Sequence, residues 1–263
     1  MWMLVITALL MGMLVPVQTA ANARMRTSVG PAFVVTLVSF AVSSLLLSVV
    51  SVVNGIPILP TAAQIANVPW WGWTGGVIAL FTITVTIYLF RALGQLQTAI
   101  LPLLGQLLFS LVIDHFGLFG SVCVPLSVQR LVAMCLLISG VLLIVVVPNL
   151  GKSKMAQPTT GRHILLWQIT GIVSGCLMAS IGAIYGRLGV CLGSAVQAST
   201  VSFLVAAAVL AAVCVGNREI PRVRGAFAQN NPWGVWLGGV GGAISGFGNA
   251  WVIPAVWAGA VFM

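Results

Sequence analysis

Five polar side chains stand in stretches of sequence that are otherwise almost entirely apolar. They are four carboxamides and one phenol: Gln18, Gln106, Gln197, Asn249 and Tyr88. A carboxamide carries up to four hydrogen-bonding positions, so in lipid it needs protein partners or water. Such side chains face the interior of a helix bundle, where they bond between helices or line a path for a polar solute. We predict these five as substrate-binding candidates, with interhelical hydrogen bonding as the alternative for each.

Acidic side chains are almost missing from the sequence, which contains only Asp114 and Glu219. Neither lies in the middle of an apolar run. A proton-coupled carrier needs a titratable group that water reaches from both sides of a membrane. Asp114 with its neighbour His115 is the one pair that meets this description, so we list it as a proton-coupling candidate. A structural cap or an ion pair with Arg130 is the alternative, and neutral or anionic solutes fit the sequence better than cations.

Catalytic and metal-binding patterns are not found in the sequence. It has no Ser-His-Asp set, no His-Glu helix motif and no phosphate-binding loop, so we predict no enzyme activity, no cofactor and no metal site. The five cysteines lack paired or metal-ligand spacing, and we expect them to be buried as small apolar groups. A disulfide between Cys123 and Cys191 remains open at this point.

The composition places the chain in a lipid bilayer. Hydrophobic residues make up 60% of the chain and charged residues 5%, with a mean hydropathy of +1.15, whereas soluble domains are about 25% charged. The formal net charge is +9, but the basic residues are spread thinly between apolar runs. This distribution argues against a nucleic-acid partner and is typical of membrane topology signals.

Apolar runs of about 20 residues predict the membrane-spanning helices. Backbone polar groups in lipid must be satisfied within each segment, so these runs are helices. Breakers such as Gly30-Pro31 and Asn54-Gly55 separate them. We predict eight complete spans, near 2–21, 31–53, 70–90, 93–112, 129–147, 164–184, 193–215 and 234–254. The residues from Pro254 to Met263 are expected to begin a ninth helix.

An internal repeat relates the two halves at a constant offset of 163 positions, the separation of Asn67 and Asn230. The repeat predicts an all-α polytopic protein built from two five-helix units, of which the second is incomplete. We assign residues 1–150 to the first unit, 151–163 to a cytoplasmic linker and 164–263 to the second unit. An odd number of helices in each unit makes the two units inverted relative to each other. Further pairs with this offset are Gly12/Gly175, Arg24/Arg187, Gly30/Gly193, Ser39/Ser202, Phe40/Phe203, Trp70/Trp233 and Gly76/Gly239.

Basic residues predict the orientation of the chain. Nine of the eleven fall in alternate loops, and only Arg130 and Arg187 lie on the other side. By the positive-inside rule the loops with the nine are cytoplasmic, and the N-terminus is outside. The paired tryptophans fit as anchors at the membrane interfaces, or alternatively as a stacking wall for a substrate.

Small and ring-containing residues predict where helices approach or break. Glycines recur every four residues near the end of the sequence, which predicts close helix packing or, alternatively, free space beside a substrate. Pro16 and Pro102 are expected to break their helices locally. The glycines are Gly234, Gly238, Gly242 and Gly246.

Four motifs together resemble the YdcZ family of bacterial inner-membrane exporters, a branch of the drug/metabolite transporter superfamily. They are Asn22-Ala-Arg-Met-Arg26, Pro69-Trp-Trp-Gly-Trp73 followed by Gly75-Gly76, Gly105-Gln106-Leu107, and Asp114-His-Phe-Gly-Leu-Phe-Gly120. The resemblance implies five-helix units used as pairs or fused in tandem, and an export role. This chain departs from the fused pattern: Tyr185-Gly186-Arg187 replaces the second Asn-Ala-Arg, and counterparts of the last two helices are not found.

Two functions follow as expectations. The first is a secondary transporter that exports a small metabolite or drug across the bacterial inner membrane by alternating access between inverted repeats. The second is a non-transporting membrane subunit, a truncated paralogue that pairs with another five-helix unit. The expected partners are the lipid bilayer, a small-molecule substrate, and either a second copy of the chain or a second five-helix unit.

Overall fold

The computed structural model describes residues 2–124, 161–227 and 233–261, with short stretches of one to three residues between 127 and 143. Every regular element in these residues is a helix. Four helices are long and apolar enough to cross a membrane, namely Ala32–Val53, Gly75–Phe116, Ile164–Leu192 and Ala195–Gly216. The predicted all-helical membrane class is therefore confirmed. The predicted span 129–147 and linker 151–163 lie largely outside the described residues, and the total of eight spans stays a prediction. The expected start of a ninth helix at Pro254 was wrong, because the helix that begins at Leu237 continues through Pro254 to Val261.

The longer helices end at glycines rather than where the apolar runs end. The first helix reaches Val29 and the helix from Gly161 reaches Leu192, past the predicted ends at 21 and 184. Gly30 and Gly193 follow with φ of 92° and 72°, a backbone conformation that glycine adopts without steric cost. The elements are α1 (Trp2–Val29), α2 (Ala32–Val53), α3 (Ala62–Asn67), η1 (Trp70–Trp73), α4 (Gly75–Phe116), η2 (Leu118–Gly120), α6 (Gly161–Leu192), α7 (Ala195–Gly216), η3 (Ile220–Phe227), η4 (Trp233–Trp236) and α8 (Leu237–Val261).

A kink divides α4 into two arms. Gly94 has φ 77° and ψ 176° inside the helix, so the arms 75–93 and 95–116 correspond to two of the predicted spans. Pro16 and Pro102 instead lie within α1 and α4 where these stay helical. The expected local breaks at these prolines are therefore not seen: α1 continues through Pro16, and the break in α4 lies at Gly94 instead of Pro102.

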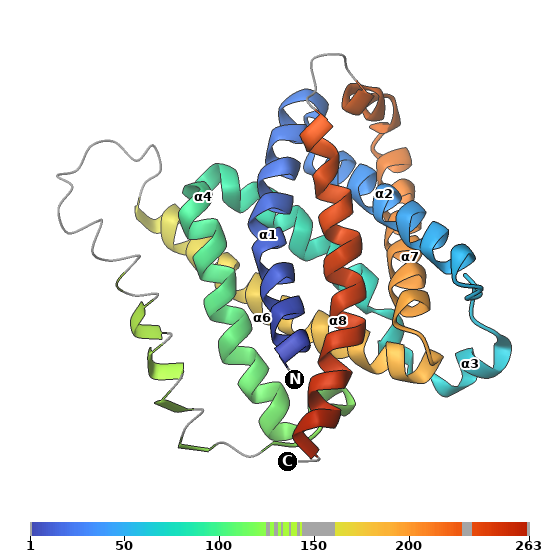
Figure 1. Ribbon diagram of the computed structural model, residues 1–263. Coiled ribbons are helices and arrows are strands. Elements are labelled where there is room, and N and C mark those ends of the chain that lie inside the picture. The colour runs from blue at the N-terminus through green and yellow to red at the C-terminus, as the bar shows by residue number, and fades with distance from the viewer. Residues whose placement is uncertain are drawn as a thin grey trace.

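α1 packs antiparallel to α8 and α2 antiparallel to α7 (Figure 1). α6 lies along α4, opposite in direction to the first arm and in the same general direction as the second. Close approach depends on glycine. A Cβ on Gly105 would collide with the Ile172 carbonyl, and one on Gly175 with the Pro102 carbonyl. The predicted packing of the α8 glycines is confirmed at three positions, where a Cβ would press on a facing side chain, and not at Gly234, where it would meet nothing. The three contacts are Gly238 with Asn22, Gly242 with Ser43 and Gly246 with Phe203.

Aromatic packing forms the centre of the bundle. Phe40 of α2 meets Phe203 of α7 edge to face, with ring centroids 5.1 Å apart. Both rings are almost fully buried within one apolar cluster that also contains Tyr185. The two phenylalanines are partners in the 163-residue repeat, so the repeat places equivalent residues against each other at the bundle centre.

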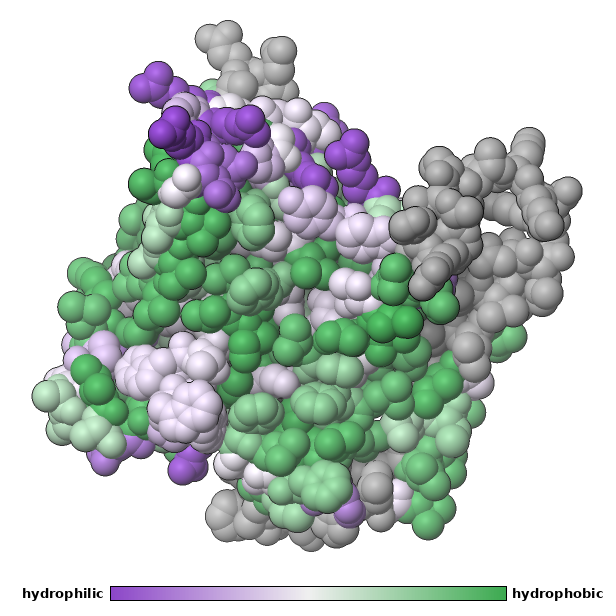
Figure 2. Space-filling view, turned by 180° about the vertical axis from the view of Figure 1, so that it is seen from behind, coloured by the Kyte–Doolittle hydropathy of each residue, from purple (hydrophilic) through white to green (hydrophobic). Residues whose placement is uncertain are grey.

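Two connections meet at one end of the bundle. The backbone at Gly225 of η3 lies against the Ser28 carbonyl of α1, and Gly30 lies near the Arg222 guanidinium. Hydrophilic residues gather at this end, and an apolar band covers the middle of the molecule (Figure 2). At the other end, the Gln64 amide of α3 donates to the Leu192 carbonyl over 2.8 Å and joins α3 to the α6–α7 turn.

Candidate functional site

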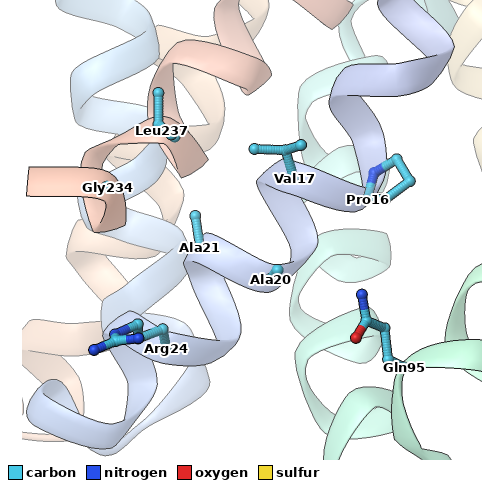
Figure 3. A pocket seen from close by; sticks show the side chains of 8 residues that line it. All are labelled: Pro16, Val17, Ala20, Ala21, Arg24, Gln95, Gly234 and Leu237. Carbon is cyan, nitrogen blue, oxygen red and sulfur yellow. The ribbon is translucent and has the colours of Figure 1, made fainter. Parts of the chain in front are cut away.

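A pocket of about 360 Å³ lies between α1, the second arm of α4 and the beginning of α8 (Figure 3). Its walls are mostly apolar or small. Two polar groups stand among them, a guanidinium from α1 and a carboxamide from α4. The lining residues are Pro16, Val17, Ala20, Ala21, Arg24, Gln95, Gly234 and Leu237.

The kink in α4 places the carboxamide. Gln95 directly follows Gly94, so the change of helix direction brings its side chain toward α1, as Figure 3 shows. Arg24 lies one helical turn beyond Ala20 and is exposed. The pocket therefore combines an apolar wall with a positive charge and a neutral hydrogen-bonding group, and no carboxylate lines it.

The two arginines near the end of α1, Arg24 and Arg26, differ in the contacts that their guanidinium groups make. The Arg26 guanidinium lies 4.5 Å from the centre of the Tyr88 ring, and it donates to the Ile87 carbonyl over 3.3 Å. This pairing fastens the end of α1 to the first arm of α4. The Arg24 carbonyl accepts from the Thr27 hydroxyl over 2.7 Å, but within the part of the chain that the structure describes its guanidinium has no hydrogen bond or ion pair. The charge of Arg24 is therefore available to a solute or to a lipid headgroup.

A buried polar cluster lies next to the pocket, where α1, α2 and α8 cross. The Ser39 hydroxyl donates to Asn22 Oδ1 over 2.7 Å, and Asn22 is 2% exposed. The Ser43 hydroxyl lies 2.7 Å from the Gly239 carbonyl, to which it donates. We call Asn22, Ser39 and Ser43 the asparagine cluster; it fixes the depth at which α8 enters the bundle.

The equivalent crossing in the other half carries Tyr185 in place of Asn22. Its ring packs so closely on Gly75 that a Cβ there would lie 2.6 Å from Cε1. Its hydroxyl is buried without a hydrogen bond of good geometry, although the Ser202 side chain lies beside it. An uncompensated hydroxyl of this kind costs free energy, so the crossing is stabilised by ring packing.

The structure does not gather the five predicted substrate-binding residues into one place. Gln18 is half-buried against Gly241 and Gly242, beside the asparagine cluster. Tyr88 is half-buried under Arg26 at the end where α1 meets α2, and Asn249 is half-buried on α8. Gln106 is exposed on the second arm of α4. None of these residues lines the pocket, and their roles stay predictions.

Gln197 belongs to a hydrogen-bonded cluster at the opposite end from Tyr88. It is 1% exposed. Its amide donates to the Leu59 carbonyl over 3.2 Å, and its oxygen accepts from Gln64 over 3.3 Å. Gln64 itself completes a capping box with Thr61 at the start of α3. Gln197 thus holds the connection before α4 onto the α6–α7 turn.

Asp114 and His115 end α4 at the same end of the bundle as Gln197. Both are half-buried, and the His115 ring lies edge to face with Phe116 at 4.9 Å. The Asp114 carbonyl accepts from the Val124 amide over 2.8 Å, and the His115 carbonyl accepts from the Cys123 thiol over 3.0 Å. These backbone contacts close the turn after α4, while proton coupling at this pair stays a prediction. All five cysteines are free thiols, including Cys123 and Cys191.

Sequence reasoning missed Arg24 and Gln95 as lining residues. Both lie near helix ends, where a polar side chain is expected to reach water and is not singled out. The break at Gly94 was the usable signal, since it fixes which side of α4 faces α1. Asn22 and Ser39 were also missed, although Asn22 opens one of the four motifs and its repeat partner, Tyr185, has different chemistry. No group of three or more potential metal ligands occurs among the described residues.

Comparison with known proteins gives one family. A family model described as "Putative inner membrane exporter, YdcZ" matches residues 3–143 and 166–263, which is most of the chain. The two matched segments begin 163 positions apart, at 3 and at 166. Neither the curated proteins nor the solved structures gave a match.

Proposed function

The chain belongs to the YdcZ family of inner-membrane exporters, and from that premise we propose that it exports a small amphipathic anion. The pocket beside the α4 kink carries this proposal. Its apolar wall suits an apolar body, and the Arg24 guanidinium with the Gln95 carboxamide suits a carboxylate or phosphate head. Among the lining residues no acidic group opposes a negative charge.

Alternating access between inverted repeats is the proposed mechanism. Supporting it, equivalent residues make equivalent contacts in the two halves. A Cβ on Gly76 would meet the Ser202 carbonyl and one on Gly239 the Ser39 carbonyl, while Gly75 faces Tyr185 as Gly238 faces Asn22. Each of these pairs maps onto the other at the 163-residue offset. Two halves with matching crossings can exchange conformations by rocking about the central α2–α7 contact.

The proposed orientation places the pocket at the cytoplasmic surface. Three observations support it. The segment η3, which carries Arg222 and Arg224, lies against the end of α1 that carries Arg24 and Arg26. At this end Arg26 donates to the Ile87 carbonyl of α4, whereas Arg187 lies at the other end of the bundle, against Gly120. A basic end is retained in the cytoplasm during insertion. An anionic solute would then enter the pocket from the cytoplasm.

Binding is tested by thermal stabilisation of the purified chain in lipid nanodiscs. The panel contains alkyl carboxylates and alkyl phosphates, with alkyl ammonium compounds of equal chain length as the charge control. A ligand that binds the folded state raises Tm as its concentration passes the dissociation constant. We expect the anions to raise Tm and Arg24→Gln to abolish the increase, while Arg91→Gln, which removes another exposed arginine at the same end, keeps it.

Transport is tested next, by loading proteoliposomes with the compound that binds best. Efflux that depends on Arg24 supports the proposal. Equal stabilisation by the ammonium compounds, or a response unchanged in Arg24→Gln, contradicts the proposed site.

A second candidate function is a membrane subunit that pairs with another helical unit. One observation favours it: Gln106, a carboxamide in the middle of an apolar arm, is exposed on the surface of the described bundle. A polar side chain facing lipid is costly, and a neighbouring protein relieves that cost. Efflux by the chain alone in proteoliposomes would argue against this candidate.

A further inference from the structure

Two guanidinium groups border the turn between α1 and α2. From α1, Arg26 Nε donates to the Gly30 carbonyl over 3.2 Å. From η3, Arg222 approaches the same residue, because a Cβ built on Gly30 would lie 3.9 Å from Arg222 Nη1. Gly30 is itself exposed, so a solute or a lipid headgroup can reach this turn. We call Arg26 and Arg222 the arginine pair.

Packing holds η3 in this position on the end of α1. A Cβ on Gly225 would press on the Ser28 carbonyl, and Ala226 is 1% exposed. Val223 packs against the apolar cluster at the end of α1. Arg222 is therefore carried by a segment whose backbone is fixed against α1, while its own side chain is exposed.

No carboxylate neutralises the arginine pair within the described residues. The chain has two acidic residues, of which Asp114 lies at the opposite end of the bundle. The Glu219 carbonyl accepts from the Arg222 amide over 2.9 Å. The Glu219 carboxylate, however, forms no ion pair with Arg222, and its Oε2 is buried without a hydrogen bond. Two like charges beside one residue repel each other, and an anion bound between them removes that repulsion.

Both guanidinium groups keep donors that no described residue uses. Arg26 bonds through Nε to Gly30 and through Nη1 to the Ile87 carbonyl over 3.3 Å, and it lies 4.5 Å from the centre of the Tyr88 ring. Its Nη2 makes no hydrogen bond to these residues, and neither does the side chain of Arg222. A guanidinium presents five N–H donors in a fixed fork that matches the oxygens of a phosphate. Two such forks beside one turn suit two oxygens of a single phosphate group.

The start of α2 adds to the positive potential at this turn. The helix begins at Ala32, and its N-cap, Pro31, supplies no side-chain hydrogen bond. The N-terminal end of a helix carries a partial positive charge, which favours an anion nearby.

Exposed apolar side chains place the arginine pair at the surface of the bilayer. Ile220 and Phe227, at the two ends of η3, are 40% and 71% exposed, and the Phe227 ring lies 5.1 Å from that of Trp236. Hydrophilic residues gather at this end of the molecule, beside the apolar band (Figure 2). Segments that carry both basic and apolar side chains lie at the level of the lipid headgroups. The arginine pair thus stands where phospholipid phosphates lie.

We propose that the arginine pair binds a phosphate group that carries an uncompensated negative charge. An anionic phospholipid headgroup and a free phosphate in solution share this chemistry, and the experiment separates the two sources. A phosphate bound by both side chains would join η3 to the end of α1. The site is distinct from the candidate pocket, since neither Arg26 nor Arg222 lines it. The inference does not depend on the proposed export function.

The lipid arm of the test uses native mass spectrometry of the full chain, freed of lipid in a neutral detergent and titrated with phosphatidylglycerol. Phosphatidylcholine with the same acyl chains is the charge control. We expect phosphatidylglycerol to bind more tightly, and Arg222→Gln to weaken its binding about tenfold by removing charge-assisted hydrogen bonds. Arg224→Gln removes another exposed arginine of η3 and should change the affinity less than about twofold.

The phosphate arm measures Tm of the same detergent-solubilised chain in inorganic phosphate and in chloride at equal ionic strength. A phosphate-specific rise in Tm that Arg222→Gln abolishes supports the site and assigns it to free phosphate. Phosphatidylglycerol binding that depends on Arg222, without this rise, supports the site and assigns it to the lipid headgroup. Arg26→Gln should act like Arg222→Gln; because it also removes the contacts with Ile87 and Tyr88, Arg222→Gln decides the test if Arg26→Gln does not fold.

Three results would overturn the proposal. The first is phosphatidylglycerol binding and phosphate stabilisation that are both unchanged in Arg222→Gln. The second is an equal loss in Arg224→Gln, which shows attraction to the basic end as a whole. The third is an unchanged chain that binds phosphatidylglycerol no more tightly than phosphatidylcholine and does not respond to phosphate.

The pocket and the arginine pair are tested independently. Arg24→Gln should leave phosphatidylglycerol binding unchanged, and Arg222→Gln should leave stabilisation by alkyl carboxylates unchanged. In nanodiscs the phospholipids already supply phosphate groups at this interface, so the assay of the pocket reports on Arg24. Loss of one response without the other therefore refutes only the proposal to which that response belongs.

Discussion

The crossing of α1, α2 and α8 and the crossing of α6, α7 and α4 use the same backbone geometry with different side chains. In the first, Asn22 accepts a hydrogen bond from Ser39 over 2.7 Å. In the second, Tyr185 occupies the position of Asn22 and presses its ring on Gly75, while its hydroxyl lacks a well-formed hydrogen bond. One crossing depends on polar pairing and the other on aromatic packing.

The shared element of the two crossings is a pair of glycines at the start of the entering helix. Gly75 and Gly76 lead into α4, and Gly238 and Gly239 into α8. Because they have no side chain, the helix backbone reaches the facing helix directly, and the residue opposite is free to differ. Hydrogen bonding and ring packing are thus interchangeable here only because glycine sets the distance.

The largest effect is expected from filling that distance. Gly76→Leu would place a side chain against the Ser202 carbonyl, a backbone atom that cannot rotate away. Overpacking costs about 1–3 kcal/mol and more where backbone must move, so we expect loss of folded protein or a large fall in Tm, measured by fluorescence-detected size exclusion after heating. Gly234→Leu is the control, since its Cβ would meet nothing within 4 Å. A Tm near that of the unchanged protein would show that the crossing is loose.

The α4 kink distinguishes the two halves in a second way. Gly94 has φ 77° and ψ 176°, a region almost restricted to glycine, whereas the equivalent position 257 lies within the helix α8. Gly94→Ala should therefore destabilise the protein by about 1–3 kcal/mol through backbone strain, since a Cβ there meets nothing within 4 Å. Chemical denaturation in mixed micelles measures this loss. An unaffected midpoint would mean that α4 can straighten.

The asparagine cluster should contribute less than the glycines. Asn22→Ala removes the acceptor of the Ser39 hydroxyl, and interhelical hydrogen bonds in membranes are worth roughly 0.6 kcal/mol on average and up to about 1.7 kcal/mol. We expect a loss in this range. A double-mutant cycle with Ser39→Ala isolates the pair, and additive losses would show that the two side chains do not couple.

Tyr185→Phe should have the smallest effect and sharpens the comparison most. It removes a buried hydroxyl without a well-formed bond and leaves the ring in place. We expect a change in the free energy of unfolding within about 0.5 kcal/mol, or a slight stabilisation, because no satisfied bond is lost. A loss as large as that of Asn22→Ala would show that the hydroxyl has a partner in the membrane, for which Ser202 is the candidate.

Much of the fold followed from hydropathy and breakers. The helix from Ala32 to Val53 agrees within one residue with its prediction, because Gly30-Pro31 and Asn54-Gly55 bracket a single apolar run. The family was also predictable from short motifs. The ends of α1 and α6 were not predictable in this way. In both, the apolar run ends several residues before the helix does, and the helix ends only at Gly30 and at Gly193.

The candidate site was less accessible to prediction. Amides within apolar runs were the natural candidates, yet Gln197 is a buried fastening for the α3 connection, and Gln106 lies on the surface of the described bundle. When a helix is apolar on all sides, the neighbouring helices decide which side faces inward. The periodicity of hydrophobic residues along these helices therefore indicates little about which side is buried. The Gly94 kink, which turns Gln95 toward α1, depends on a single backbone angle.

The pairing of α2 with α7 has a consequence for how the chain is made. Ser51 and Thr200, whose hydroxyls lie 3.4 Å apart, are separated by 149 positions. At about 5–20 residues per second, roughly 8–30 s of synthesis pass before the partner of α2 exists. The hydroxyls of α2 tolerate this wait, because Thr36, Ser43 and Ser44 each donate to the carbonyl four residues earlier, over 2.8–2.9 Å. A helix that satisfies most of its side-chain hydroxyls internally loses little in the bilayer until α7 arrives, and Ser51 is the hydroxyl that waits for its partner.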